Sequence, residues 1–336
     1  MKKLVVLLLL ALTILTGCNA SNDSEKDTIT MVWYPNESGA DLEESRNHLA
    51  KLISEATGKI VEHELTTDYA IAIESIANGK ADLAFMGAQG YVEAKNKNEN
   101  LRPLTVPSGS DGTLDSAVYY SWLAVNKGDE PNYASADGFS IDNIKGKRFS
   151  FVSNSSTSGF KVPSSSIISH FSDDNLTEES LSEGGEGNFF SEVLFGGSHQ
   201  GSAINLLTGR ADVAAFCDTC VFNYVELAEG EENKPGSTYK VRDDAAEPFQ
   251  DQDGKEFVII SSTPVLNAPF VANLDTLSEE DFTKIRDMMT SDEVAKDPLV
   301  FVPEDAETKG LFTQDGDRRF LEVEDAWFNP IRELSK

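Results

Sequence analysis

A repeated segment is the feature that most constrains how this chain can fold. Residues 69–85 align without a gap to residues 199–215, at an offset of 130 positions. Each copy has a helical apolar pattern that ends at a glycine, Gly79 or Gly209, before a basic residue and a short apolar strand. A helix leading into a strand, present twice, predicts an α/β fold with one such unit in each of two lobes. The alternative is that a Gly-basic-Ala-Asp segment recurs by chance.

A distinctive side chain stands at the start of each repeated helix. It is Tyr69 in the first copy and His199 in the second. Ligands of such folds lie at the carboxyl ends of parallel strands, where helix starts also offer backbone donors. The repeat therefore predicts a ligand cleft between two lobes.

Chain length supports the same division. About 310 residues follow the N-terminal segment described below, which is more than one hydrophobic core usually organises. We predict a first lobe from residues 28–123 and 264–336 and a second lobe from residues 124–263. Apolar strands at 119–125 and 257–262 would cross between them.

Two further segments have a distinctive composition. The stretch 226–254 is rich in acids, Gly, Pro and Lys, and is interpreted as a surface excursion of the second lobe. The tail from 277 to 336 is expected to be largely helical and to pack on the first lobe.

The N-terminus resembles a bacterial lipoprotein signal. Two lysines precede an apolar run of about a dozen residues, too short to span a bilayer, and Leu15-Thr16-Gly17-Cys18 follows. We predict a signal peptide at 1–17, a lipid on Cys18 and a flexible polar tether over 18–27. The mature protein would then be extracytoplasmic and anchored to the cell membrane. The alternative is an uncleaved anchor.

The charge of the chain restricts its partners. The formal net charge is -29, which argues against nucleic acid or an anionic membrane surface. An anionic ligand would be opposed by the overall field. Its attraction would have to come from local dipoles and hydrogen bonds.

A run of small hydroxyl residues, Ser153 to Pro163, offers such local donors. It follows a predicted strand at 148–152 and opens a predicted helix that begins near Ser158 and continues to Phe171. A helix start leaves backbone N–H groups unpaired and carries partial positive charge, so phosphate-like groups bind there. The alternative is that Ser156 or Thr157 is only an N-cap.

Two cysteines remain besides Cys18. Cys217 and Cys220 are three positions apart, a spacing compatible with a disulfide, two free thiols or a metal site. A zinc site would need further ligands in a chain with four histidines. We expect no metal and no redox catalysis.

Four pieces of the chain, in order, resemble the substrate-binding lipoproteins of phosphonate and phosphite ABC importers, the PhnD-like group. The pieces are Asp68-Tyr69-Ala70 with residues 79–87, the strand 119–127, Ser156-Thr157-Ser158-Gly159-Phe160 with Pro163, and Gly197-Ser198-His199 with Asp212-Val213-Ala214. The resemblance covers nearly the whole mature chain. It implies the type II periplasmic-binding-protein fold, with two lobes that close on a ligand by a hinge.

The resemblance also implies roles for individual residues. Ser156, Thr157 and Ser158 would hold the phosphoryl oxygens, and His199 would donate a further hydrogen bond from the facing wall. Two tyrosines would contact the ligand from the first lobe, and an acid would lie near the pocket; these are Tyr69, Tyr119 and Asp218. A tetrahedral oxyanion needs donors that converge from several directions.

One position departs from the family pattern. Family members that bind aminoalkylphosphonates have an acid where our alignment places Ala268. An ammonium group would lack its counter-charge without that carboxylate. We therefore expect phosphite, phosphate or a small alkylphosphonate as ligand. Cys217 also departs from the pattern and is expected to fill space beside the pocket.

The function implied is delivery of this oxyanion to an ABC permease and its ATPase by a monomeric binding protein that is not an enzyme and needs no cofactor. One alternative is a lipid-anchored sensory module on the same fold. Another is a hydrolase that uses Ser158, His199 and Asp218. The hydrolase is disfavoured because the chain has no Gly-x-Ser-x-Gly motif.

Overall fold

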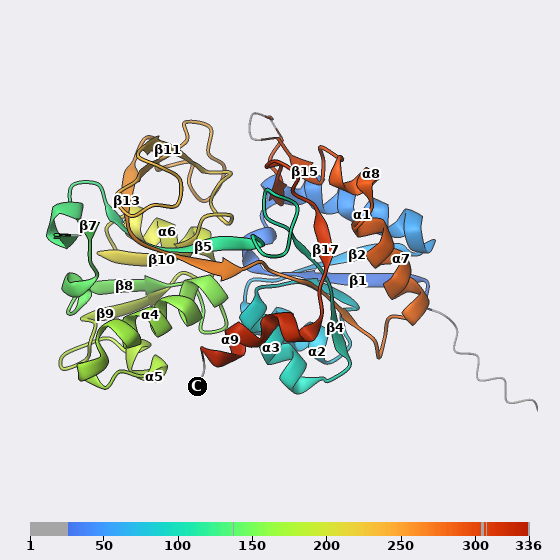
Figure 1. Cartoon of the computed structure of the whole chain (residues 1–336), viewed down its shortest axis with the longest axis horizontal. Coiled ribbons are helices and arrows are strands. Elements are labelled where there is room, and N and C mark those ends of the chain that lie inside the picture. The colour runs from blue at the N-terminus through green and yellow to red at the C-terminus, as the bar shows by residue number, and fades with distance from the viewer. Residues whose placement is uncertain (1–25, 137, 304–305, 307, 335–336) are drawn as a thin grey trace, which may run out of the picture.

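Two lobes, each built on its own sheet, lie side by side in the computed structural model (Figure 1). The structure describes residues 26–136, 138–303, 306 and 308–334, so the predicted signal peptide, Cys18 and most of the tether lie outside the described residues. None of the helices in the described part of the chain is long and apolar enough to cross a membrane. The predicted two-lobed α/β fold is confirmed.

The first lobe has a six-stranded sheet in the order β17-β4-β14-β3-β1-β2. Its strands are β1 (Thr28–Trp33), β2 (Ile60–Leu65), β3 (Leu83–Phe85), β4 (Leu101–Pro107), β14 (Phe270–Asn273) and β17 (Phe320–Glu322). Strand β1 pairs in parallel with β2 and β3, and β14 pairs antiparallel with β3 and β4. The late strands thus return to a sheet that the early strands begin.

Helices cover both faces of this sheet (Figure 1). One face carries α2 (Tyr69–Ala77), α3 (Ala88–Lys97) and α9 (Asn329–Glu333), and the other carries α1 (Glu43–Thr57), α7 (Glu279–Met289) and α8 (Asp292–Ala295). The short 3-10 turns η1 (Pro35–Glu37) and η2 (Ala40–Leu42) link β1 to α1, and η7 (Asp325–Phe328) precedes α9. Because each face is covered, β14 is buried along its whole length and β1 is buried on both faces at its carboxyl end.

The second lobe has a seven-stranded sheet in the order β11-β12-β13-β5-β10-β8-β9. Its strands are β5 (Val118–Asn126), β8 (Arg148–Phe151), β9 (Glu192–Phe195), β10 (Val213–Cys217), β11 (Val225–Glu229), β12 (Thr238–Val241) and β13 (Glu256–Leu266). Helix α6 (His199–Leu207) packs on one face, and α4 (Val162–His170) and α5 (Glu178–Leu181) pack on the other. The minor elements are η3 (Glu130–Tyr133), β6 (Ala134–Ser135), β7 (Gly138–Phe139), η4 (Asp142–Ile144), η6 (Ser172–Asp174), and, in the first lobe, β15 (Phe301–Val302) and β16 (Phe312–Thr313).

Strands β5 and β13 join the lobes. They pair antiparallel from Val118 opposite Leu266 to Asn126 opposite Phe257, and Figure 1 shows them running from one lobe into the other. The predicted lobe boundaries, after residue 123 and before residue 264, fall inside these two strands.

The repeat has the same geometry in both lobes. Helices α2 and α6 have nine residues each, and the glycine after each helix, Gly79 or Gly209, has φ 71°. The aspartate that follows accepts a hydrogen bond from a neighbouring strand: Asp82 from Thr30 N at 2.7 Å and Asp212 from Arg148 N at 2.9 Å. These bonds anchor the segment after each helix to its sheet in the same way. The first residues of the two helices, Tyr69 and His199, line the same cavity between the lobes.

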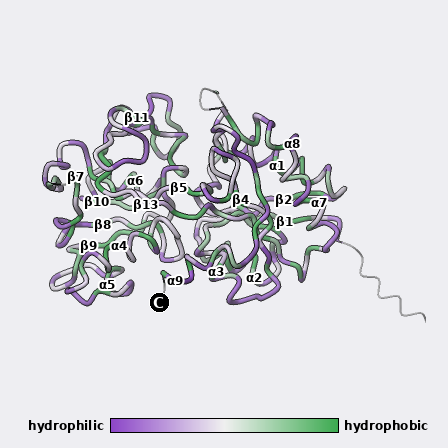
Figure 2. The backbone as a smooth tube through the Cα atoms, in the orientation of Figure 1, coloured by the Kyte–Doolittle hydropathy of each residue, from purple (hydrophilic) through white to green (hydrophobic). Residues whose placement is uncertain are grey.

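Two predictions about local structure were wrong. The stretch 226–254 contains most of β11 and all of β12, which extend the second sheet, although Figure 2 shows that the loops around them are hydrophilic. The tail after 277 does pack on the first lobe, but β15, β16 and β17 alternate with its helices. The predicted helix from near Ser158 to Phe171 is confirmed, although its first turn, η5 (Thr157–Lys161), is π-helical and α4 begins at Val162.

Candidate functional site

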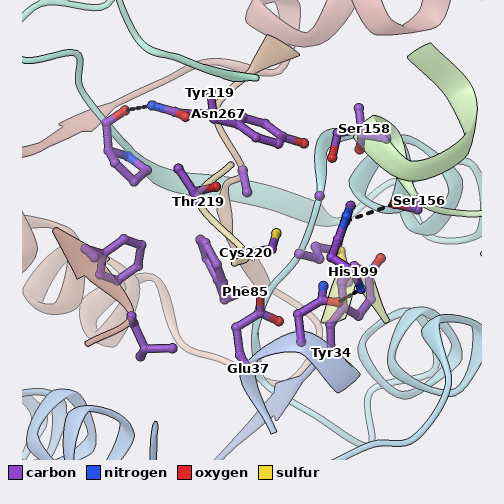
Figure 3. A pocket seen from close by; sticks show the side chains of 18 of the residues that line it. Tyr34, Glu37, Phe85, Tyr119, Ser156, Ser158, His199, Thr219, Cys220 and Asn267 are labelled. Carbon is purple, nitrogen blue, oxygen red and sulfur yellow. Dashed lines mark hydrogen bonds between the residues drawn. The ribbon is translucent and has the colours of Figure 1, made fainter. Parts of the chain in front are cut away.

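A cavity of about 100 Å³ lies between the two lobes. It is much smaller than the roughly 300–1,000 Å³ of sites for drug-sized ligands, so it suits a small ion. Figure 3 shows side chains from both lobes pointing into it. Six of the seven predicted binding residues line it: Tyr69, Tyr119, Ser156, Thr157, Ser158 and His199.

The hydroxyl run forms one wall. Ser156 caps the π-helical turn, and its Oγ accepts a hydrogen bond from Gly159 N at 3.1 Å. The prediction that Ser156 is an N-cap and the prediction that it meets a ligand are therefore compatible. Ser158 is also buried, and its Oγ has no hydrogen-bond partner among the described residues. π-Helical turns are rare and are often found at functional sites.

Thr157 lies where the two lobes touch. Its Oγ1 accepts a hydrogen bond from Gln89 N, at the start of α3 in the first lobe, at 2.9 Å. A Cβ on Gly87, which precedes α3, would lie 2.7 Å from that oxygen. Glycine is thus required at position 87 for this close approach.

His199 is neutral and its tautomer is fixed by the fold. Its Nδ1 accepts a hydrogen bond from Cys217 N at 3.0 Å, and burial lowers its pKa to about 3. The ring proton is therefore on Nε2, which lies 3.3 Å from Ser156 Oγ and donates toward it. Figure 3 shows this bond beside the cavity. His199 belongs to the same lobe as the serines, so the expectation that it lies on the facing wall was wrong.

The first lobe supplies the tyrosine of the repeat. Tyr69 is buried, and its hydroxyl accepts a hydrogen bond from Asn36 Nδ2 at 2.6 Å. Its ring packs against Tyr34 with 4.1 Å between the centroids. Burial raises the pKa of Tyr69 and of Tyr119 well above the ordinary value, so both hydroxyls keep their protons. Tyr119 comes from the crossing strand β5.

Sequence reasoning did not identify Asn36 and Glu37, which lie in η1 directly after β1. Asn36 bridges the two repeated helices, because its Oδ1 also accepts a hydrogen bond from His199 N at 3.0 Å. Glu37 lines the cavity with one carboxyl oxygen buried and unpartnered among the described residues. Their position after the first strand of a parallel pair was the available signal.

Asp218 is not among the residues that line the cavity. Its Oδ1 accepts hydrogen bonds from Tyr120 N at 2.8 Å and Thr219 N at 2.7 Å, and burial raises its pKa to about 6. Asp218 does not contact His199, whose Nδ1 already accepts a hydrogen bond from Cys217 N. A serine–histidine–aspartate relay needs that nitrogen to donate to the acid, so this geometry does not build one.

The two cysteines form a disulfide, which decides between the three alternatives left open by their spacing. Cys217 is fully buried, and Cys220 lines the cavity. The sulfurs lie near His199 in a group that could hold a metal only if the disulfide were reduced. As expected, Cys217 fills space next to the pocket.

Much of the rest of the cavity lining is apolar, from Phe85, Pro107, Val118, Ala268, Leu311 and Phe312. Arg318 is the only lining residue, among those described, with a permanent positive charge, and its guanidinium is bound to Thr313 and Asp315. The lining thus combines hydroxyl, imidazole and amide groups with hydrocarbon.

Further hydrogen bonds join the lobes around the cavity. Ser155 Oγ donates to Glu93 at 2.7 Å, and Tyr224 OH donates to Asp41 at 2.8 Å. Together with the Asn36–His199 and Thr157–Gln89 bonds, they hold the two lobes together near the cavity without a ligand.

A sequence profile described as "ABC transporter, phosphonate, periplasmic substrate-binding protein" matches residues 31–328. A phosphate-import protein PhnD of Mycolicibacterium smegmatis is 30% identical over 197 residues, which cover 58% of this chain and 56% of that protein. The alignment thus spans little more than half the length of that relative.

Two solved structures share the fold. A binding protein component of an ABC phosphonate transporter from Pseudomonas aeruginosa has a TM-score of 0.65 at 21% identity, over 92% of this chain and 85% of that one. PhnD1 from Prochlorococcus marinus, solved in complex with methylphosphonate, has a TM-score of 0.65 at 15% identity, over 92% and 97%.

Proposed function

The chain belongs to the family of periplasmic phosphonate-binding proteins of ABC transporters, and on this premise we propose that it captures a small phosphorus oxyanion and delivers it to a membrane permease. The ligand would be phosphite, phosphate or a small alkylphosphonate. It would bind in the cavity between the lobes, and the lobes would open and close by bending at β5 and β13.

The observation that carries this proposal is that three hydroxyl oxygens of the cavity accept hydrogen bonds from protein N–H groups. Ser156, Thr157 and Tyr69 accept from Gly159, Gln89 and Asn36 respectively. An oxygen that accepts from the protein has its own O–H left to donate. Three hydroxyl groups from two lobes can thereby donate at one small cavity, where the Tyr69 and Ser156 hydroxyls also interact with each other.

The remaining donors are mostly neutral, and one cation, Arg318, also lines the cavity with its Nε buried and unpartnered among the described residues. Ser158 Oγ is buried and unpartnered among the described residues, and the starts of η5 and α6 contribute partial positive charge. Neutral donors and helix starts suit a chain whose formal net charge is -29. Cavities built from such dipoles bind oxyanions by hydrogen bonding.

The substituent on phosphorus would lie against the apolar residues of the lining. Ala268 is one of them, so the position where aminophosphonate binders have an acid offers only a methyl group here. A hydrogen, a hydroxyl or a small alkyl group fits a cavity of about 100 Å³ better than a longer chain. Asp218, behind the wall, would act on the ligand only through its neighbours.

Attachment to the membrane is part of the proposal. Cys18 would carry the lipid, and a monomeric binding domain would meet the permease and its ATPase at the membrane surface. A Cys18→Ser variant should leave the membrane fraction and appear in the soluble one. Its retention in the membrane fraction would contradict the lipid anchor.

The proposed ligand class is tested by calorimetry on the mature domain with phosphate, phosphite, methylphosphonate and 2-aminoethylphosphonate. One of the first three should bind most tightly, with one ion per protein. Tightest binding of the aminated compound would contradict the argument from Ala268. No heat with any of the four would refute the oxyanion site itself.

A further inference from the structure

Glu37 is an unusual residue for an anion site. It lines the same cavity as the serines and His199, yet its Oε2 atom is buried with no hydrogen-bond partner among the described residues. Figure 3 shows Glu37 of η1 across the cavity from Ser158 and Tyr119, with its carboxyl group extending into the cavity. An ionised carboxylate there would repel a bound oxyanion at short range.

The groups around Glu37 do not neutralise it by direct pairing. Arg46 of α1 is a cation that acts on Glu37, but its Nη1 donates to the backbone carbonyls of Glu37 and Gly39. The other titratable groups that face Glu37 or share its cavity are Tyr34, Tyr69, Tyr119, Tyr224, His199 and Arg318. The four tyrosines keep their protons because burial raises their pKa values, and His199 is neutral.

Burial therefore governs the protonation of this carboxyl. It raises the pKa of Glu37 to about 8, against smaller lowering effects of hydrogen bonds from the Glu37 backbone and the Asn36 side chain and of the Arg46 charge. The group is largely protonated at neutral pH, when it can donate one hydrogen bond. An anion in the cavity would favour the protonated form further.

We propose that the site binds its oxyanion together with one proton, held between Glu37 and a ligand oxygen. The proton belongs to either partner: a Glu37 carboxylic acid donates to a fully ionised ligand, or a carboxylate accepts from a P–OH group. Both descriptions contain the same atoms and charge. The inference rests on the proposed function, because it concerns the ligand of that same site.

The shared proton would act as a selectivity device. Above the pKa of Glu37 the phosphate dianion still brings a P–OH group into the cavity, whereas sulfate and the dianions of phosphite and methylphosphonate carry no acidic proton, so a proton must be taken up from solution. Binding of these three ions should therefore weaken as pH rises, because an ionised Glu37 and such a dianion have no proton to share. The expected fall in affinity approaches tenfold per pH unit above about pH 8.

The test is calorimetry of phosphite and methylphosphonate at pH 9 in two buffers that differ in enthalpy of ionisation, with phosphate, whose dianion keeps its P–OH, as the comparison. The difference in observed heat gives the number of protons taken up per ion bound. The wild-type protein should take up about one proton with phosphite or methylphosphonate and almost none with phosphate. Uptake near zero with phosphite or methylphosphonate, in a protein that still binds that ion, would overturn the inference while leaving the proposed function intact.

A matched pair of variants identifies the residue. Glu37→Gln keeps a hydrogen-bond donor but cannot gain a proton, so at pH 9 uptake with phosphite or methylphosphonate should fall by about one proton and sulfate should bind within tenfold of phosphate. Glu44→Gln makes the same chemical change at an exposed position of α1 and should behave as wild type. Equal proton uptake in wild type and Glu37→Gln would overturn the assignment. It would also be overturned if Glu37→Gln lost only a preference for 2-aminoethylphosphonate, because Glu37 would then be the counter-charge of the ammonium group. If the wild type binds none of the ions, the proposed function fails and this inference falls with it.

Discussion

Replacing Ser158 with alanine should separate ligand binding from folding. The Ser158 side chain is buried, and its Oγ has no hydrogen-bond partner among the described residues. The ligand-free fold gains little from this hydroxyl, whose interaction with the Tyr119 hydroxyl is not a well-formed hydrogen bond, and bears the cost of removing it from water. Unfolding of the ligand-free variant in urea should therefore require the same free energy as wild type, or up to about 1 kcal/mol more.

The affinity of the Ser158→Ala variant for its ligand should fall, although its ligand-free stability does not. A hydrogen bond to a charged group contributes about 1.5–3 kcal/mol, so the dissociation constant measured by calorimetry should rise roughly 10- to 150-fold. Alanine differs from serine by one oxygen, so the shape of the cavity is preserved. The affinity loss would be the effect of the missing donor.

Ser156→Ala provides the comparison. Ser156 Oγ accepts from Gly159 N and lies next to His199 Nε2, so its loss removes an N-cap and leaves two donors without a partner. Ligand-free stability should fall by about 2 kcal/mol, and affinity should fall as well. If Ser158→Ala destabilises the ligand-free protein as much as Ser156→Ala and leaves affinity unchanged, the assignment of Ser158 as a ligand donor is refuted.

Three further perturbations follow from the geometry. Gly87→Ala places a Cβ 2.7 Å from Thr157 Oγ1, so affinity should fall about tenfold or more while ligand-free urea unfolding is unchanged; normal affinity would show that the lobes tolerate the extra atom. His199 has a pKa near 3 in the fold against an ordinary 6.5, so the unfolded chain binds more protons between these values; unfolding free energy should fall as pH drops through this window, by up to about 1.4 kcal/mol per pH unit more in wild type than in His199→Gln, and identical slopes would contradict this. The double variant Cys217→Ala, Cys220→Ala removes a short disulfide loop, so stability should fall by about 2 kcal/mol in non-reducing buffer, with no difference once wild type is reduced; an equal wild-type stability in both buffers would mean that the disulfide does not stabilise the fold.

The repeat was predictable because its signals are local. Gly79 and Gly209 adopt positive φ angles that favour glycine, and each aspartate after them binds a strand that precedes it in the chain. The helix before each glycine needs only its own apolar spacing. These requirements are written in consecutive residues, so a sequence comparison within the chain finds them.

Strands at the sheet edge were not predictable in the same way. Strand β11 has one buried and four exposed residues, and its acidic side chains give it the composition of a loop. Strands β15, β16 and β17 have two or three residues each, too few for a period to be detected. Their existence depends on partners far away in the chain.

The candidate site shows the same division. The serine run and His199 were found from helix starts, which are local features. Asn36 and Glu37 lie in a three-residue turn without any period, and Asn36 acquires its role by bonding to Tyr69 and His199, 33 and 163 positions later. The π-helical turn likewise depends on the close packing of Gly159 against Val152, where a Cβ would lie 2.2 Å from a methyl carbon.

The bonds that join the lobes have a consequence for how affinity can evolve. The Thr157, Ser155 and Tyr224 bonds form between protein groups, so they stabilise the joined arrangement equally for every ligand. Apparent affinity is the intrinsic affinity multiplied by the fraction of molecules that can adopt that arrangement. Weakening one such bond by about 1 kcal/mol would lower affinity about fivefold for all ligands alike. Substitutions at the rim could therefore adapt the protein to scarce or abundant nutrient without altering which nutrient it prefers.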